Sequence, residues 1–232
     1  MRSRAASPSS PRRSWVAEPV TTYAFQGPSR GADRAVLLAH GAGTDLDAAP
    51  LRAVADALAD AHIPSLRFNY PYRDAGRRAP DRPAVLMDAT RAAIDELSRR
   101  TRLPTDRLVV GGRSMGGRYC SLVVAAEAEP VAVRGLLLLG YPLHAAGKPD
   151  RRRDEHFRHL TVPVLFVSGT RDALASRPEL ERSARAVRGP VSWCWLDTAD
   201  HGFKPLKSSG RTLTDVLATV AEASVTWVRR LP

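Results

Sequence analysis

The chain has 232 residues, 44% of them hydrophobic, which suits a single hydrophobic core and requires no second domain. Its two cysteines, Cys120 and Cys194, are not at metal-ligand spacing, so we expect free thiols, a reducing compartment and no metal. The net charge of +11 comes from scattered arginines, and no aromatic residues interleave with the densest cluster at residues 151–153. We therefore expect no nucleic-acid partner.

Residues 1–19 are rich in Arg, Ser and Pro and lack hydrophobic periodicity, which predicts a disordered tail before a single domain over residues 20–232. Arg12 and Arg13 are weakly similar to a twin-arginine export signal, but the apolar segment that export needs does not follow them. No apolar run approaches the length of a membrane span. We expect a cytoplasmic protein without a membrane partner.

Apolar strands alternate with segments of helical period from residue 20 to the end of the chain. This alternation is typical of an α/β fold with a mostly parallel sheet covered by helices on both faces. The predicted strands are residues 20–25, 35–40, 65–70, 108–111, 135–139, 162–168 and 192–196.

Helical spacing of apolar residues predicts helices around residues 51–58 and 86–97, directly after Ser114, and near the C-terminus. The last of these should bury one face, made of Leu213, Val216, Leu217, Val220, Trp227 and Val228. Between the fifth and sixth strands only residues 140–161 are available for an insertion, with room for one short helix over 152–160. We therefore expect no large cap domain and an open or lightly covered site.

The fourth strand stops abruptly in a G-x-S-x-G pentapeptide that runs from Gly112 to Gly116. Glycines on both sides of a strand-to-helix turn let the strand and the helix approach more closely than a Cβ atom permits. The pattern is typical of the nucleophile elbow of α/β-hydrolases, with Ser114 as the nucleophile.

A serine hydroxyl needs a histidine to accept its proton and an acid to orient that histidine. In the α/β-hydrolase fold the chain order is serine, acid, histidine. Asp172 follows the sixth predicted strand and His201 follows the seventh, so both lie at the carboxyl edge of the sheet. We predict Ser114, Asp172 and His201 as a catalytic triad.

Other roles exist for two of these residues. Asp172 has the alternative role of a helix N-cap, and His201 that of an ordinary loop histidine. Asp197 and Asp200 are weaker candidates for the acid, because Asp197 lies at a strand end and Asp200 adjoins the histidine that it would have to orient.

The tetrahedral intermediate also requires backbone N–H donors. One is expected from Met115, which follows the nucleophile at a helix N-terminus. The second is expected from the loop that begins at His40, with Ala42 as the first choice and Gly43 as the reserve. His40 itself is interpreted as structural, holding the loop through a ring hydrogen bond.

Several polar or aromatic residues follow the predicted strands or lie on the elbow, and could line a substrate pocket, although rim packing or solvation explains each one separately. If Arg73 and Arg113 both pointed into the cleft, a substrate with a carboxylate would fit. These candidates are Tyr70, Tyr72, Arg73, Arg113, Arg118, Tyr141 and His144, together with Gly43.

Six motifs in this order resemble a group of α/β-hydrolases that includes testis-expressed protein 30 and the third subunit of the NSL histone acetyltransferase complex, and that is related to dienelactone hydrolase. The resemblance covers about residues 35 to 228 and leaves out the N-terminal tail. It implies an α/β-hydrolase fold without a large cap and the triad already named, but no substrate. The motifs are HGAG (40–43), FNYPY (68–72), GGRSMGGR (111–118), GYPLH (140–144), GTRD (169–172) and DHGFKP (200–205).

The sequence therefore predicts a cofactor-independent serine hydrolase, a monomer or homodimer, that cleaves an ester, thioester or lactone of a small substrate. One alternative is a non-catalytic interaction protein that keeps the fold as a scaffold. A second alternative is amide or peptide cleavage, for which the sequence gives no sign of peptide selection.

Overall fold

The computed structural model describes residues 21–232, so the prediction for residues 1–19 lies outside the described residues. A seven-stranded sheet has the order β1-β3-β2-β4-β5-β6-β7, in which β1 is antiparallel to β3 and all other neighbours are parallel. The strands are β1 (Tyr23–Gln26), β2 (Ala35–Ala39), β3 (Ser65–Phe68), β4 (Leu108–Arg113), β5 (Gly135–Leu139), β6 (Val164–Gly169) and β7 (Val191–Leu196).

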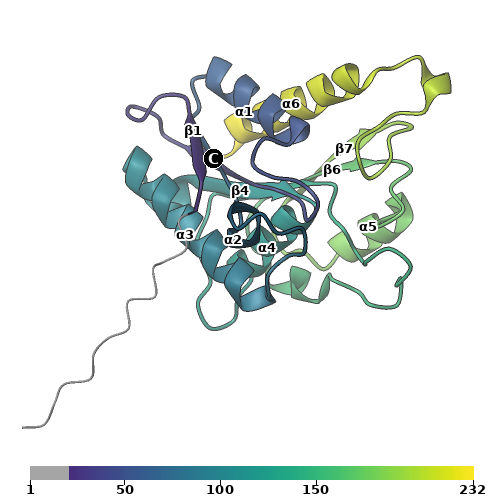
Figure 1. Cartoon of the computed structure of the whole chain (residues 1–232), viewed down its shortest axis with the longest axis horizontal. Helices are drawn as coiled ribbons and strands as arrows, with labels where there is room; N and C mark the ends of the chain where they lie inside the picture. The colour runs from purple at the N-terminus through teal and green to yellow at the C-terminus, as the bar shows by residue number, and fades with distance from the viewer. Residues whose placement is uncertain (1–20) are drawn as a thin grey trace, which may run out of the picture.

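Helices cover both faces of the sheet (Figure 1). α1 and α6 lie side by side on one face, and α3, α4 and α5 pack against the other. Three short 3₁₀ helices, η1 (Thr105–Arg107), η2 (Glu155–His159) and η3 (Lys207–Ser209), lie in the connections. The α-helices are α1 (Ala49–Asp60), α2 (Pro71–Asp74), α3 (Pro83–Thr101), α4 (Met115–Val124), α5 (Arg177–Ala184) and α6 (Leu213–Arg230).

Each face of the sheet has its own hydrophobic core. Along β2, Ala35, Leu37 and Ala39 pack toward α3 and α4, whereas Val36 and Leu38 pack toward α1 and α6. Side chains alternate between the faces of a strand, so a strand covered on both sides must be apolar at every position. All five residues of β2 are fully buried, which explains its uninterrupted apolar run.

All seven predicted strands are present, with ends shifted by up to three residues within the described part of the chain. The α/β-hydrolase fold without a large cap is confirmed. The predicted helix over residues 152–160 is the shorter η2. One position was wrong: Leu213 is 43% exposed, because it is the first residue of α6 and precedes the turns that contact the sheet.

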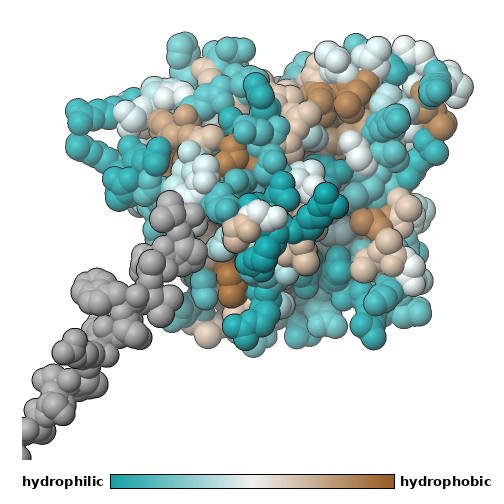
Figure 2. Space-filling model, in the orientation of Figure 1, coloured by the Kyte–Doolittle hydropathy of each residue, from teal (hydrophilic) through white to brown (hydrophobic). Residues whose placement is uncertain are grey.

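Two helices were not predicted from the apolar pattern. α5 is polar on most of its surface, but Ser176 and Glu179 form a capping box at its start, a signal that the sequence does contain. α2 is a single turn that begins at Pro71. On the face shown in Figure 2, hydrophilic side chains predominate and apolar ones form separate small patches.

No helix within residues 21–232 is both long enough and apolar enough to span a bilayer.

The elbow packs closely against the end of β2. A Cβ atom on Gly112 would lie 2.1 Å from the carbonyl oxygen of Ala39, and one on Gly116 would lie 2.3 Å from the same atom. The φ of Gly112 is +151°, a conformation that other residues rarely adopt. β2, β4 and the start of α4 therefore pack backbone against backbone.

This contact predicts that Gly112→Ala destabilises the protein by about 3 kcal/mol or more, through both the clash and the backbone strain. The free energy of unfolding would be measured by chemical denaturation. Gly43→Ala is the matched control, since no atom lies within 4 Å of its Cβ position. Equal stability of the two variants would contradict the close packing of β2 against the elbow.

Candidate active site

The candidate site lies where the direction of strand order reverses. β2 and β4 are neighbours, but the chain continues outward from β2 to β3 on one side and from β4 to β5 on the other. Loops at the carboxyl ends of two such strands diverge and leave a crevice in which α/β proteins bind ligands. The loop after β2 and the elbow after β4 flank this crevice.

Ser114 occupies the turn between β4 and α4. Its φ of 49° and ψ of −112° are strained for a residue with a side chain. The amide of Ser114 donates to the carbonyl of Leu139, 2.9 Å away, which ties the turn to the end of β5. Strain of this kind is typical of a nucleophile elbow, because it lifts the hydroxyl clear of the sheet.

The structure brings Ser114, His201 and Asp172 together from three separate loops. His201 Nε2 lies 3.0 Å from Ser114 Oγ, and His201 Nδ1 lies 2.8 Å from Asp172 Oδ2. The Asp172 side chain is fully buried, and its other oxygen accepts a hydrogen bond from the Leu174 amide at 2.8 Å. Asp172 therefore both shapes its own loop and contacts the ring of His201.

The two alternative acids lie elsewhere. Asp200 Oδ1 accepts hydrogen bonds from the amides of Gly202 and Lys204, at 2.8 and 2.9 Å, and so shapes the loop that carries His201. Asp197 is exposed. Only Asp172, among the described carboxylates, is hydrogen-bonded to the His201 ring.

The two predicted oxyanion donors, Met115 and Ala42, line the same cavity as Ser114. Within residues 21–232, neither backbone amide has a hydrogen-bond acceptor. Tyr72 Oη donates to the Ala42 carbonyl at 2.8 Å, which fixes the orientation of that peptide. Gly43, the reserve donor, is exposed and does not line the cavity.

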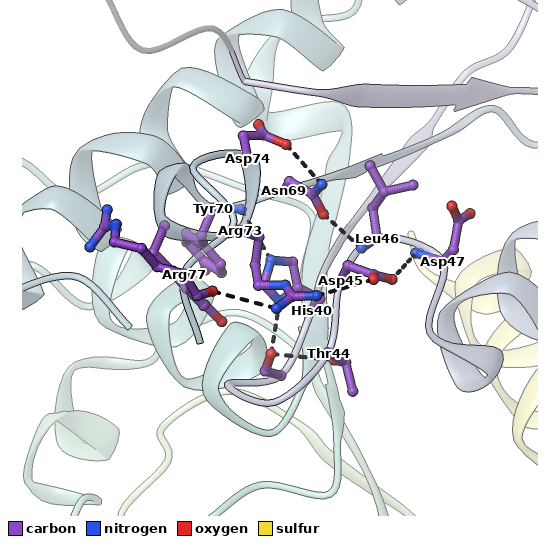
Figure 3. A network of polar contacts seen from close by, with 12 residues as sticks. His40, Thr44, Asp45, Leu46, Asp47, Asn69, Tyr70, Arg73, Asp74 and Arg77 are labelled. Atoms are coloured by element: carbon purple, nitrogen blue, oxygen red, sulfur yellow. Dashed lines mark hydrogen bonds and ion pairs between the residues drawn. The ribbon is translucent and has the colours of Figure 1, made fainter. Parts of the chain in front are cut away.

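His40 holds the loop after β2 from beneath (Figure 3). Its Nε2 accepts a hydrogen bond from the Tyr70 amide at 3.1 Å, so its Nδ1 carries the proton and donates to the Gly41 carbonyl at 2.7 Å. Burial lowers the pKa of His40, which favours this neutral form. The ring hydrogen bonds predicted for His40 are therefore present.

Tyr70 and Tyr141 were predicted to line the pocket, and the structure contradicts both. Tyr70 is fully buried in the core, with its hydroxyl 3.1 Å from Thr90 Oγ1. Tyr141 is also buried, and its hydroxyl donates to the Arg153 carbonyl at 2.6 Å. Both rings turn inward because the aromatic clusters beneath the loops give them apolar neighbours.

Arg73 and Arg113 do not point into the cavity either. Arg73 lies beside the loop after β2, with its guanidinium 3.5 Å from Asp45 (Figure 3). Arg113 lies beneath the His201 loop, where it donates to the His201 carbonyl and stacks over Phe203. Burial lowers the pKa of Arg113. Both arginines support loops, so the condition for their binding a substrate carboxylate is not met.

Two further candidates from the sequence, Tyr72 and His144, do not line the cavity either. Tyr72 is buried beneath the loop after β2. His144 is buried and its Nδ1 lies 3.0 Å from the Ala145 carbonyl.

A cavity of about 330 Å³ opens beside Ser114. The sequence analysis named Arg118 as a residue that could line the pocket. Arg118 follows Ser114 by four residues, so it lies one helical turn from the nucleophile and on the same side of α4 (Met115–Val124). The sequence analysis did not identify the lining residues that come from loops, because loop residues show no periodic hydrophobic pattern. The cavity is lined by Ala42, Pro80, Asp81, Leu86, Ser114, Met115, Arg118, Tyr119, Pro142, Arg153 and Leu174.

A larger cavity of about 600 Å³ lies between β7 and α6, beside Pro163 and Trp227. Pro163 precedes β6, so this cavity is at the edge of the sheet opposite the site. None of its lining residues belongs to the Ser114 group. Among the described residues, no cluster of three or more His, Cys, Asp or Glu side chains could hold a metal ion.

His156 makes the stability of the protein depend on pH. Burial, and then the charge of Arg118, lower the pKa of His156 to about 4. Between pH 6.5 and 4 the unfolded chain binds a proton that the folded chain does not, so the free energy of unfolding falls as pH falls, by about 1.4 kcal/mol per pH unit for this group. His156→Gln should lessen that loss in denaturation experiments at pH 4.5 and 7.

His62→Asn is the matched control. His62 is exposed and has a φ of 57°, a conformation that asparagine tolerates. If His156→Gln and the control lost stability equally on acidification, burial of a neutral His156 would be contradicted.

Comparisons with known proteins identify the family and the fold. An alpha/beta hydrolase domain family model matches residues 32–229. A dienelactone hydrolase from Anabaena variabilis has a TM-score of 0.68 at 22% identity, with 94% of this chain and 95% of that chain covered. An alpha-beta serine hydrolase homologue from Coxiella burnetii has a TM-score of 0.67 at 15% identity, with 88% and 91% covered.

Est1E from Butyrivibrio proteoclasticus, solved with ferulic acid bound, has a TM-score of 0.67 at 14% identity, with 90% and 96% covered. At these identities the structural likeness shows a shared fold. The family match over most of the chain shows that this protein belongs to the alpha/beta hydrolase domain family.

Proposed function

We propose that the protein is a serine hydrolase that cleaves an ester, thioester or lactone of a small substrate. The observation that supports this most strongly is the hydrogen-bonded series from Asp172 through His201 to Ser114, at 2.8 and 3.0 Å, beside a cavity. The three groups have the order and the spacing needed to activate a serine hydroxyl.

In the proposed reaction Ser114 Oγ attacks the substrate carbonyl while His201 Nε2 takes the hydroxyl proton. Asp172 holds the His201 ring and stabilises its charged form from a fully buried position. His201 then gives the proton to the departing alcohol or thiol, and an acyl group stays on Ser114. Water, deprotonated by His201, releases the acid and regenerates the serine.

The oxyanion formed in each step would be held by the amides of Met115 and Ala42. Neither amide has an acceptor among the described residues, so both are free to donate. Met115 is the first residue of α4, where the helix dipole favours negative charge. Tyr72 and His40 hold the Ala42 loop in place, so donation requires little rearrangement.

The choice of acyl chemistry also draws on relatives. The structural neighbours include esterases and a dienelactone hydrolase. The resemblance to the group of testis-expressed protein 30 and the third NSL subunit is part of the same proposal, as is a monomeric or homodimeric state. The free thiols Cys120 and Cys194 support a cytoplasmic location.

Ser114→Ala should lower the hydrolysis of 4-nitrophenyl acetate by about 10³-fold or more, since the nucleophile is lost. It should also abolish labelling by a fluorophosphonate probe, which in the wild type should form an adduct on Ser114 detectable by mass spectrometry. A folded wild-type protein that is not labelled would instead favour the non-catalytic scaffold.

Asp172→Asn should lower kcat by roughly 10³ to 10⁴-fold, because an amide cannot hold the same histidine tautomer or stabilise its charge. Asp197→Asn is the matched control, since Asp197 is exposed and precedes the same loop as His201. Both variants would be assayed with the same ester across pH 6 to 9. An Asp172→Asn enzyme as active as the control would remove Asp172 from the triad.

A further inference from the structure

Arg113 stands directly before Ser114 in the chain, and its side chain reaches the residue that carries the base. It is the last residue of β4, and its guanidinium donates a hydrogen bond to the carbonyl of His201. Ser114 and His201 are 87 residues apart in the sequence. One side chain therefore connects the backbone beside the nucleophile to the backbone of the base.

The guanidinium of Arg113 packs against two further residues. Its central carbon lies 5.4 Å from the centre of the Phe203 ring, and Phe203 is fully buried. A Cβ atom added to Gly41 would lie 3.6 Å from Arg113 Nη1, in ordinary van der Waals contact. Gly41 precedes Ala42, the proposed oxyanion donor. Arg113 thus lies beside both the loop after β2 and the loop that carries His201.

The loop that carries His201 is closed by its own backbone. Hydrogen bonds of 2.9 and 3.0 Å within residues 200–204 fix the shape of this loop, but not its place relative to Ser114. Among the described residues, the His201 carbonyl accepts a hydrogen bond from Arg113 alone. Arg113 therefore holds the backbone of His201, while Asp172 holds its ring.

The charge of Arg113 lies among the charges of the site. Within residues 21–232 Arg113 forms no ion pair, but burial lowers its pKa, and the negative charges of Asp172 and Asp200 oppose that lowering. Two carboxylates beside one imidazole favour its protonated form, which cannot accept a proton from serine. The guanidinium offsets one of these negative charges. When His201 takes the proton from Ser114, two positive and two negative charges are in balance.

We propose that Arg113 is a positioning residue for the hydrolysis, which sets the place of His201 relative to Ser114 and offsets the excess negative charge around the His201 ring. This inference rests on the proposed function, because it concerns the same serine and histidine. Arg113 does not line the cavity, so the role requires no contact with the substrate. A guanidinium suits it because one planar group combines a charge, several N–H donors and a surface that stacks on an aromatic ring.

The test uses three variants of the full chain. Arg113→Met keeps an unbranched apolar side chain and removes the charge and the donors, whereas Arg113→Lys keeps the charge without the planar group. Arg171→Met is the matched control, since Arg171 is exposed, adjoins Asp172 and donates to the Thr198 carbonyl at 3.3 Å. It removes the same charge and the same kind of bond close to the same loop. Chemical denaturation first establishes that each variant is folded.

With 4-nitrophenyl acetate, Arg113→Met should lower kcat about 10²-fold and change KM by less than about threefold, because a small displacement of the base slows the reaction without weakening binding. The pH below which kcat/KM declines should rise, because the uncompensated carboxylates favour a protonated ring. Arg113→Lys should lower kcat about tenfold and leave that pH where the wild type has it. Arg171→Met should match the wild type in both respects.

The possible results decide between these roles. The proposal is overturned if a folded Arg113→Met keeps the wild-type kcat and pH profile, or if it raises KM at constant kcat. It is also overturned if Arg171→Met shifts the pH profile as far as Arg113→Met, since the effect would then be general charge attraction. Should Arg113→Met not fold, Arg113→Lys decides, and a wild-type kcat in that variant overturns the positioning role.

Failure of the proposed function gives a different result. In that case the wild type hydrolyses no ester, and the ring of His201 is followed by NMR titration of protein labelled with ¹⁵N-histidine, with His201→Gln to assign its signals. We expect the ring to titrate at a higher pH in Arg113→Met than in the wild type and in Arg171→Met. Equal titration in all three proteins overturns the effect of Arg113 on His201.

Discussion

The site depends above all on the backbone contact between β2, β4 and the start of α4. Gly112 and Gly116 bring the elbow within van der Waals distance of the Ala39 carbonyl, a separation that any Cβ atom would prevent. The contact places Ser114 beside the loop after β2 and holds it in a strained conformation. The free energy for this strain comes from the fully buried strands on either side, whose burial stabilises the sheet.

The second layer of the site is a set of buried polar groups that hold loops and do not contact the cavity. His40 links the loop after β2 to the Tyr70 amide, Tyr72 binds the Ala42 carbonyl, and Arg113 supports the His201 loop. Each buried polar atom in this set is paired with a backbone group, which keeps the cost of burial low. The loops that carry the reacting groups are therefore positioned before any substrate arrives.

Charge is distributed unevenly around the cavity. Within residues 21–232, most arginines are exposed or paired, as Arg152 and Arg77 illustrate. Arg118 and Arg153 differ because they share a partly desolvated wall with the nucleophile and have no acidic partner in the described chain. Burial, and then the charge of Arg118, also lower the pKa of His156 and so favour its neutral form.

The sequence by itself determined the alternation of strands and helices, the elbow, and the order of Ser114, Asp172 and His201 along the chain. These features have periodic or local signals: burial on two faces requires apolar strands, and a sharp turn requires glycine. The helices α2 and α5 lacked an apolar period, although the capping box at Ser176 was readable.

Only the tertiary structure decided which side chains face the cavity. Tyr70, Tyr141, Arg73 and Arg113 lie close to the site in the sequence motifs but turn toward the core or toward loops. The cavity wall is instead completed by Arg153 and other residues of long loops. A loop side chain takes its direction from the packing partners it meets after folding, and those partners come from distant parts of the chain.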